Sequence, residues 1–212
     1  MDDQHIEQRD LAARLQDSAI TARIVRNIAD IEQDYHFAAG PLSDKLMREV
    51  TQTIVTKSSQ PWIVDDSGTS TLLTYPEWKS AGVGPGDAWL ELGEISDDEL
   101  DHSWISAAIR AGETQLCIEL VFRRGLVEVA EGVVRNDRAV APLLKLGMVR
   151  YETEPRLFIP IHIPAEALAM GLEQNDLDDA LLPVRKAVEI AGAAKAELDK
   201  LIDKVRAEAK RK

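Results

Sequence analysis

Residues 115–122, with the sequence QLCIELVF, decide the fold class because their polarity alternates with the period of a β-strand. We expect Cys117 in the middle of this strand to be a small buried hydrophobe rather than a nucleophile. The two faces therefore differ: Leu116, Ile118, Leu120 and Phe122 form one, while Cys117 and Glu119 lie on the other.

Further strands are predicted on the N-terminal side of this segment. Residues 62–64 and 71–75 flank the turn-rich stretch 66–69, which is typical of a β-hairpin. Residues 89–95 follow a glycine-rich loop and are expected to form the next strand. A sheet is thus predicted to begin near residue 60.

The sheet is predicted to continue on the C-terminal side of residues 115–122. Residues 126–134 and 147–152 are predicted strands, with a short helix over 138–145 between them. Residues 157–163 alternate again, but Pro160 lacks a ladder donor, so this strand should lie at an edge or contain a bulge. The sheet is expected to be mostly antiparallel.

One helix is predicted to cross this sheet. Ser96 and Glu99 have the spacing of a capping box, and Gly112 follows the last apolar residue of the segment. The helix is therefore expected over residues 96–111.

The N-terminal part is predicted to be helical. Over residues 5–38 a buried stripe is expected, and residues 40–43 should stop this helix, with Ser43 capping a second one. The stripe comprises Ile20, Ile24, Ile28, Ile31 and Tyr35, and the second helix repeats the four-residue spacing with Leu46, Val50 and Ile54.

The C-terminal part is predicted to be one long helix with a heptad seam. Residues 181–212 carry 9 basic and 5 acidic side chains, in contrast to the acidic remainder. The seam can be buried against the N-terminal helices of the same chain, giving a monomer, or in a homodimer through the C-terminal helix. It consists of Ala187, Ala191, Ala194, Leu198, Leu201 and Val205.

These elements together define an α+β fold: N-terminal helices, a mostly antiparallel sheet with one or two crossing helices, and a long C-terminal helix. Three segments are expected, a helical one over 1–58, the α+β sheet domain over 59–165, and a helical one over 166–212. We expect them to form one globular unit.

Composition narrows the functional classes. The 212 residues carry a formal net charge of −12, which disfavours direct nucleic-acid binding through a basic patch. Cys117 cannot form an internal disulfide, and the N-terminal sequence is acidic where a signal peptide would be basic, so we expect a cytoplasmic protein. No apolar run approaches the length of a bilayer span, so no membrane contact is expected.

The densest acidic group is a candidate for binding a protein partner. It consists of Asp97, Asp98, Glu99 and Asp101, followed by His102. Carboxylates in a first helical turn also favour the helix dipole, so a purely structural role explains the same residues. Trp78 and Trp89, beside the glycine-rich loop 82–86, are further partner-binding candidates provided that they are exposed.

Four carboxylates on or near predicted strands suggest an alternative, a metal-dependent hydrolase or nuclease. Paired carboxylates around a divalent ion can activate water. However, Leu and Val follow the last of the four, where a nuclease of the restriction-enzyme-like class places a lysine. The candidates are Asp87, Glu91, Glu94 and Glu119.

The leading hypothesis is an acidic binding or regulatory protein without a cofactor. Residues 61–130 carry 13 acidic and 4 basic side chains, a charge that attracts a basic protein partner or imitates nucleic acid. The glycine-rich loop lacks the Lys-Ser/Thr of a phosphate-binding loop, so no nucleotide cofactor is expected. The same charge also serves solubility.

Overall fold

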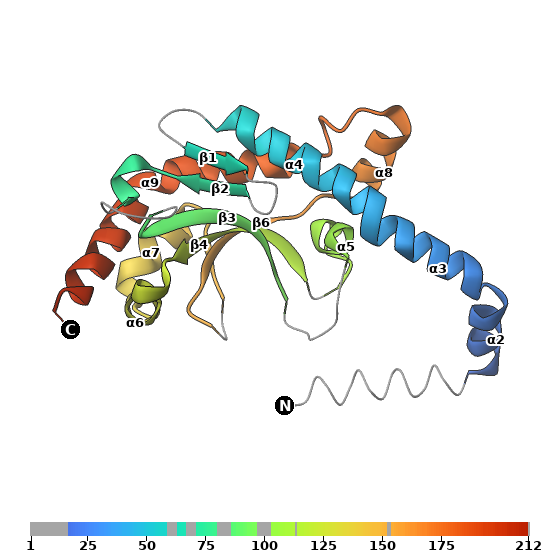
Figure 1. Cartoon of the computed structure of the whole chain (residues 1–212), viewed down its shortest axis with the longest axis horizontal. Coiled ribbons are helices and arrows are strands. Elements are labelled where there is room, and N and C mark those ends of the chain that lie inside the picture. Colours follow the sequence, from blue (N-terminus) through green and yellow to red (C-terminus); the bar gives the residue numbers. More distant parts are fainter. Residues whose placement is uncertain are drawn as a thin grey trace.

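The computed structural model describes residues 17–58, 63–66, 71–79, 86–96, 103–112, 114–151 and 154–211. Its helices and antiparallel sheet form an α+β arrangement, which confirms the predicted fold class (Figure 1). In chain order, the helices before the sheet are α2 (Ser18–Arg26), α3 (Ile28–Phe37), the π-helical turn η1 (Ala38–Leu42) and α4 (Ser43–Lys57).

The sheet contains six described strands in the order β1-β2-β3-β4-β6-β5, and every neighbouring pair is antiparallel. The longest pairing joins β3 and β4, in which Ala88 lies opposite Phe122 and Ile95 opposite Gln115. The strands are β1 (Ile63–Asp66), β2 (Thr71–Thr74), β3 (Ala88–Ile95), β4 (Gln115–Phe122), β5 (Val149–Arg150) and β6 (Leu157–Ile161).

Further helices and helical turns follow β2 in the chain. They are η2 (Pro76–Trp78), α5 (Trp104–Ile109), η3 (Arg124–Leu126), α6 (Val127–Val134), α7 (Asp137–Lys145), α8 (Ala165–Gln174) and α9 (Leu182–Ala209). In the part of the chain that is described, no helix has both the length and the apolar character needed to cross a bilayer.

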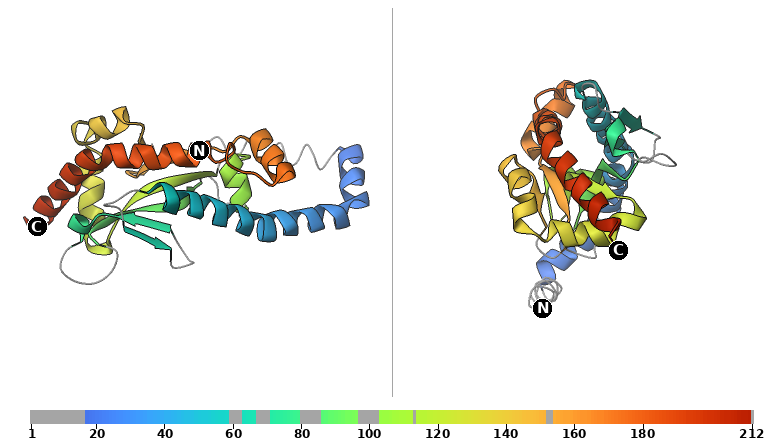
Figure 2. Two further views of the ribbon diagram at one scale, coloured as in Figure 1. Left: turned by 90° about the horizontal axis from the view of Figure 1, so that it is seen from above. Right: turned by 90° about the vertical axis from the view of Figure 1, so that its left-hand side faces the viewer.

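One face of the sheet forms the main core with α4 and α9 (Figures 1 and 2). The even-numbered apolar residues of β4 lie on this covered face, as the alternation predicts. The opposite face carries Cys117 and Glu119, and a small second cluster there joins Cys117 to Ile95 and Phe158. The two faces of β4 thus have different partners.

Helix α9 confirms the predicted seam. Each of the six seam residues is buried, and the helix packs within its own chain against α4, α6, α7 and β6. The N-terminal helices therefore supply one part of its packing surface, through α4, and the sheet layer supplies the rest.

The predicted stop at residues 40–43 is wrong. The chain continues from α3 through η1 into α4, because the wider π-turn accommodates Pro41 inside the helix. Ser43 does not act as an N-cap: its hydroxyl donates to the Ala38 carbonyl oxygen at 2.7 Å and accepts from the Ile105 N–H at 3.2 Å. The buried stripe of the first helix is also wrong, since no residue of α2 or α3 is buried.

The predicted strand over residues 126–134 is wrong as well, because this segment forms η3 and α6. Its valines favour a strand, but Val129, Ala130, Val133 and Val134 fall at helical spacing and are buried in the main core, where α6 packs on α9. Tertiary burial overrides the local preference here.

Two other predictions need adjustment. Helix α5 begins after Ser103, whose hydroxyl accepts from the Ser106 N–H. The hydroxyl of Ser96 accepts a hydrogen bond from Thr114, and Glu99, the other residue of the predicted capping box, lies outside the described residues.

The expected edge position of the strand with Pro160 is wrong, because β6 lies between β4 and β5. The missing N–H of Pro160 is tolerated because β5 pairs with β6 only at Leu157 and Phe158 and does not reach Pro160.

Gly86 allows the chain to enter β3, and its substitution should be costly. Its φ of +138° is one that L-residues rarely adopt, and a Cβ there would lie 2.9 Å from the Trp78 carbonyl oxygen. That oxygen accepts the Asp87 N–H at 2.8 Å. We therefore expect Gly86→Ala to lower the free energy of unfolding, measured in urea, by about 1–3 kcal/mol.

Gly132 in α6 is the matched control. A Cβ there meets nothing within 4 Å, so Gly132→Ala should raise the free energy of unfolding by about 0.4–1 kcal/mol. Equal effects of the two substitutions would contradict the role given to the Gly86 backbone.

Candidate functional site

Two of the four predicted catalytic carboxylates meet in the sheet. Glu91 on β3 lies directly opposite Glu119 on β4, on the face away from α4 and α9. Glu91 accepts a hydrogen bond from Trp89 Nε1 at 2.9 Å. Like charges at directly opposed positions repel, so this pair needs a nearby cation.

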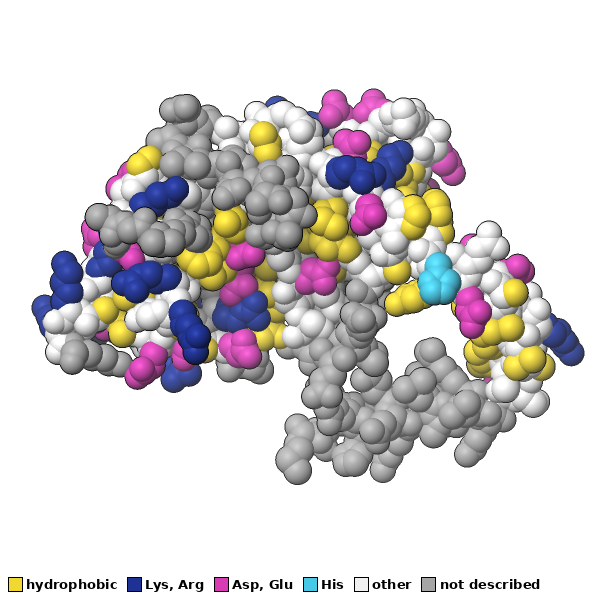
Figure 3. Space-filling view, in the orientation of Figure 1, with side chains coloured by type: hydrophobic (Ala, Val, Ile, Leu, Met, Phe, Trp, Pro, Cys, Tyr) yellow, Lys and Arg dark blue, Asp and Glu magenta, His cyan; other side chains and the backbone are white. Residues whose placement is uncertain are grey.

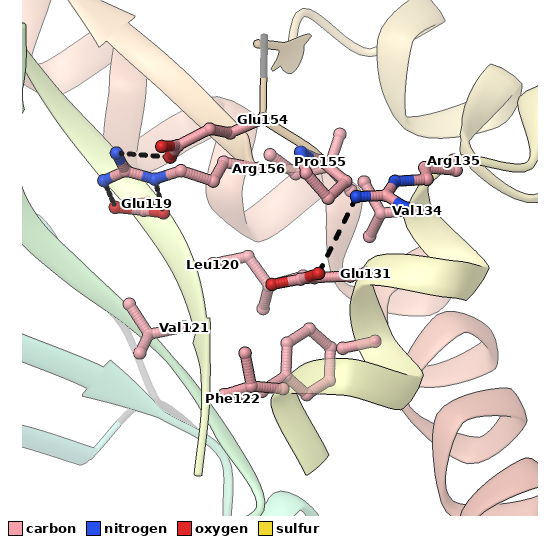
Figure 4. A pocket seen from close by; sticks show the side chains of 13 residues that line it. Glu119, Leu120, Val121, Phe122, Glu131, Val134, Arg135, Glu154, Pro155 and Arg156 are labelled. Atoms are coloured by element: carbon pink, nitrogen blue, oxygen red, sulfur yellow. Dashed lines mark hydrogen bonds and ion pairs between the residues drawn. The ribbon is translucent and has the colours of Figure 1, made fainter. Parts of the chain in front are cut away.

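Arg156 supplies that cation. Its Nε and Nη2 donate to the two carboxylate oxygens of Glu119 at 2.6 and 2.5 Å, and its Nη1 lies 3.5 Å from Glu154 (Figure 4). The hydrogen bonds with Glu119 raise the pKa of the Arg156 guanidinium, which remains charged. Both oxygens of Glu119 are thus engaged by a protein cation.

The other two candidates lie elsewhere. Glu94 is opposite Leu116, three positions along β3 from Glu91 and therefore on the other side of the strand. Asp87 precedes β3 and belongs to a separate group of ion pairs. Within the described ranges, no three His, Cys, Asp or Glu side chains are grouped so as to hold a metal ion.

Asp87 joins three distant parts of the chain. Its side chain is only 2% exposed, with Arg123 Nε at 2.6 Å from Oδ1 and Arg206 Nε at 2.9 Å from Oδ2. Its backbone accepts from the Arg123 N–H at 3.0 Å. The start of β3, the end of β4 and the end of α9 are therefore held together by one buried carboxylate.

Trp78 lies next to this group and is not the exposed anchor that the sequence suggested. It is 1% exposed, its indole Nε1 donates to Asp199 on α9 at 2.7 Å, and its ring meets Tyr75 edge-on at 5.0 Å. The glycine-rich sequence nearby indicated a surface, but the 3-10 turn after β2 directs the indole into the core. Trp89 is half-buried.

The acidic group at Asp97, Asp98, Glu99 and Asp101 lies outside the described residues, and so does most of the glycine-rich loop. The partner-binding role of this acidic group stays a prediction.

A cleft lies where β4 extends beyond its pairing with β6. The pairing of β6 with β4 ends at Glu119, where Phe158 is its partner, and β6 itself begins one residue earlier, at Leu157. Among the described strands none continues along this side of Val121 and Phe122. Helix α6 stands there instead, leaving a cavity of about 450 Å³ that we call the β4 cleft. It is lined by Glu119, Leu120, Val121, Phe122, Val127, Ala130, Glu131, Val134, Arg135, Glu154, Pro155, Arg156 and Leu157.

The β4 cleft has an apolar floor and a charged rim. Leu120 and Phe122 point from β4 towards α6, whereas Val121 points the other way (Figure 4). On the rim, Glu119 and Glu154 face Arg156, and Glu131 lies 3.8 Å from Arg135. Such a cleft suits an apolar side chain whose neighbouring polar groups meet both signs of charge.

The single cysteine of the chain lies near the cleft and is not activated as a nucleophile. Cys117 is fully buried, as the sequence suggested, and burial raises the pKa of its thiol to about 12, with Glu119 adding to the shift. The thiol is therefore neutral near pH 7 and lacks the thiolate character of a nucleophile.

Sequence reasoning missed the residues that complete the cleft. The alternation that buries Leu157 and Ile159 places Arg156 on the face of Glu119, so a signal for this pair existed. The alternation of hydrophobic residues does not give the register between β4 and β6, which brings Glu119 and Arg156 together. The rim residues Glu131 and Arg135 were missed because their segment was assigned to a strand.

No protein-family model, curated protein or solved structure matches the chain.

The pairing of Arg156 with two opposed carboxylates leads to a stability prediction. Arg156→Leu leaves Glu119 partly buried beside Glu91 and should lower the free energy of unfolding by about 1–3 kcal/mol. Glu91→Gln removes the repulsion, so it should restore roughly 0.2–1 kcal/mol in the Arg156→Leu background. A double-mutant cycle in urea measures the coupling. Strict additivity would contradict it.

The Asp87 group gives a second prediction. Asp87→Asn should lower the free energy of unfolding by about 2–4 kcal/mol, because two arginines lose their shared buried carboxylate while retaining partial access to water. Asp203 lies 3.4 Å from the same Arg206 but is 75% exposed, so Asp203→Asn should cost less than about 0.5 kcal/mol. Similar losses for the two variants would refute the assignment.

Proposed function

We propose that this protein is a non-enzymatic binding module whose β4 cleft takes a short extended segment of a partner protein, with an apolar side chain seated against α6. One observation carries the proposal. The strand β4 continues beyond its neighbour β6 into an apolar cleft that α6 closes on the far side.

The geometry favours an extended peptide. A strand without a neighbour offers main-chain donors and acceptors to an added segment, and pockets along it select alternate side chains. The cleft volume of about 450 Å³ accommodates one or a few side chains rather than a folded domain. Specificity would come from Leu120, Phe122 and Val134 on the floor and from the ion pairs on the rim.

The charges favour this mode over imitation of nucleic acid. Three acids of the acidic middle third are matched by cations within the chain: Glu119 by Arg156, Asp87 by Arg123 and Arg206, and Glu77 by Lys195 at 2.7 Å. The hydrogen bond from Lys195 also lowers the pKa of Glu77. An acid that is already paired contributes little to a phosphate-like array, so charge mimicry would depend on the other acids of residues 61–130.

The hydrolase alternative draws on the Glu91 and Glu119 pair alone. A divalent ion there would have to displace Arg156 from both oxygens of Glu119. We therefore favour the binding module, and we keep the cytoplasm as its compartment on the grounds of composition.

Val127 provides a test of the β4 cleft. It lines the cleft from the first position of α6 and is 39% exposed, so Val127→Glu changes the cleft without burying a charge. A randomised peptide library displayed on phage should yield sequences sharing an apolar residue that bind the intact chain. Fluorescence anisotropy should show at least about tenfold weaker binding to Val127→Glu.

Val55 is the matched control, because it is also a helical valine, is 36% exposed and lies outside the cleft on α4. The selected peptides should bind Val55→Glu as they bind the unaltered protein, and methyl resonances of Leu120 and Val134 should shift on binding. Equal binding to both variants, or selection of no common sequence, would overturn the proposal.

A further inference from the structure

The N-terminal arm, residues 18–37, presents an apolar surface that its own body leaves exposed. Helices α2 and α3 project away from the sheet and from α9 (Figures 1 and 2), and hydrophobic side chains gather on them at the right-hand end of Figure 3. Neither helix has a buried residue. The exposed large hydrophobic side chains are Ile24, Val25, Ile28, Ile31, Tyr35 and Phe37, with exposed fractions of 43–68%.

Helix α2 has only 9 residues, and α3 is the outer part of the helix that continues through η1 into α4. A separate helix as short as α2 is marginal in water unless an apolar face is packed against something. On α3, Ile28, Ile31 and Tyr35 recur at spacings of three and four, the pattern of a helix that packs on another helix. Ile24 continues this spacing in the sequence but lies on α2, before the break between the two helices at Asn27. An exposed apolar stripe of this kind marks an interaction surface.

The charges of the arm are segregated along its length. Helix α2 carries Arg23 and Arg26 and no acidic residue, whereas α3 carries Asp30, Glu32 and Asp34 and no lysine or arginine. Two arms that cross antiparallel about the middle of the apolar stripe bring the basic half of each onto the acidic half of the other. The arm is thus complementary to itself under two-fold symmetry.

We propose that the occupant of this surface is a second copy of the chain, and that two arms cross antiparallel around Ile28 and Ile31 to form a homodimer. The sequence spacing Ile24–Ile28–Ile31–Tyr35 is symmetric about its centre, so in this crossing α2 of one arm faces α3 of the other on both sides of the two-fold axis. This proposal does not depend on the β4 cleft, which lies on the sheet and α6.

The attachment of the arm supports the proposed arrangement. Because α3 continues through η1 into α4, which is anchored in the core by Leu46, Val50 and Ile54, the arm is held away from the body. The seam of α9 is already buried within the chain, so a homodimer through that helix would need its release. The arm offers a dimer surface that needs no such rearrangement.

The mass in solution tests the proposal first. Sedimentation equilibrium of the full chain at micromolar concentrations should give twice the mass of one chain. Ile28→Asp combined with Ile31→Asp should give one chain mass, while Leu144→Asp, on α7 at the other end of the molecule and 38% exposed, should leave the dimer intact. A monomeric unaltered protein, or a dimer that survives the double substitution, would overturn the proposal.

Charge exchange then tests the antiparallel crossing. A chain with Arg23→Glu and Arg26→Glu, and a chain with Asp30→Lys and Asp34→Lys, should each self-associate at least about tenfold more weakly. Mixed together they should form a heterodimer, because one arm is then acidic throughout and the other mostly basic. A mixture that stays monomeric, or variants that dimerise as before, would exclude the crossing.

Discussion

The packing of α9 on the covered face of the sheet is the contact on which the rest of the body depends. This helix contacts α4, α6, α7 and β6, so segments far apart in the sequence meet along one surface. Alanines at its beginning allow neighbouring elements to approach closely, and larger side chains such as Leu198 and Leu201 fill the middle. Residues as far apart in the sequence as Leu46 and Val205 therefore contribute to one core.

Electrostatics reinforces the same contact. The acidic middle of the chain and the basic last helix differ in charge, and the structure uses that difference within the molecule. Arg206 reaches Asp87, and Lys195 lies between Glu77 and Asp199 at 2.7 Å from each. These bonds connect α9 to the ends of β2 and β3. The acidic middle segment and the basic last helix are thus partly the segments that form ion pairs with each other in the structure.

Sequence periodicity predicted the parts of the fold in which one face is buried. The alternation of residues 115–122 and the heptad seam of α9 were both confirmed, because burial on one side leaves a clear pattern. Residues 126–134 were assigned wrongly because a valine-rich run permits both a strand and a buried helix. The β4 cleft could not be predicted, since it depends on where β6 begins relative to β4. The apolar stripe of the arm was found, but periodicity does not tell which molecule covers it.

The unbroken helix from α3 through η1 to α4 also has a mechanical consequence. One end of this helix is fixed in the core and the other end lies in solvent. The hydroxyl of Ser43 lies between the two ends, and it is hydrogen-bonded to Ala38 on one side and to Ile105 of α5 on the other. A force that tilts the arm would reach α5 through this hydroxyl and through the packing of η1 and α4 on α5. From α5, which packs on β4, it would pass into the sheet.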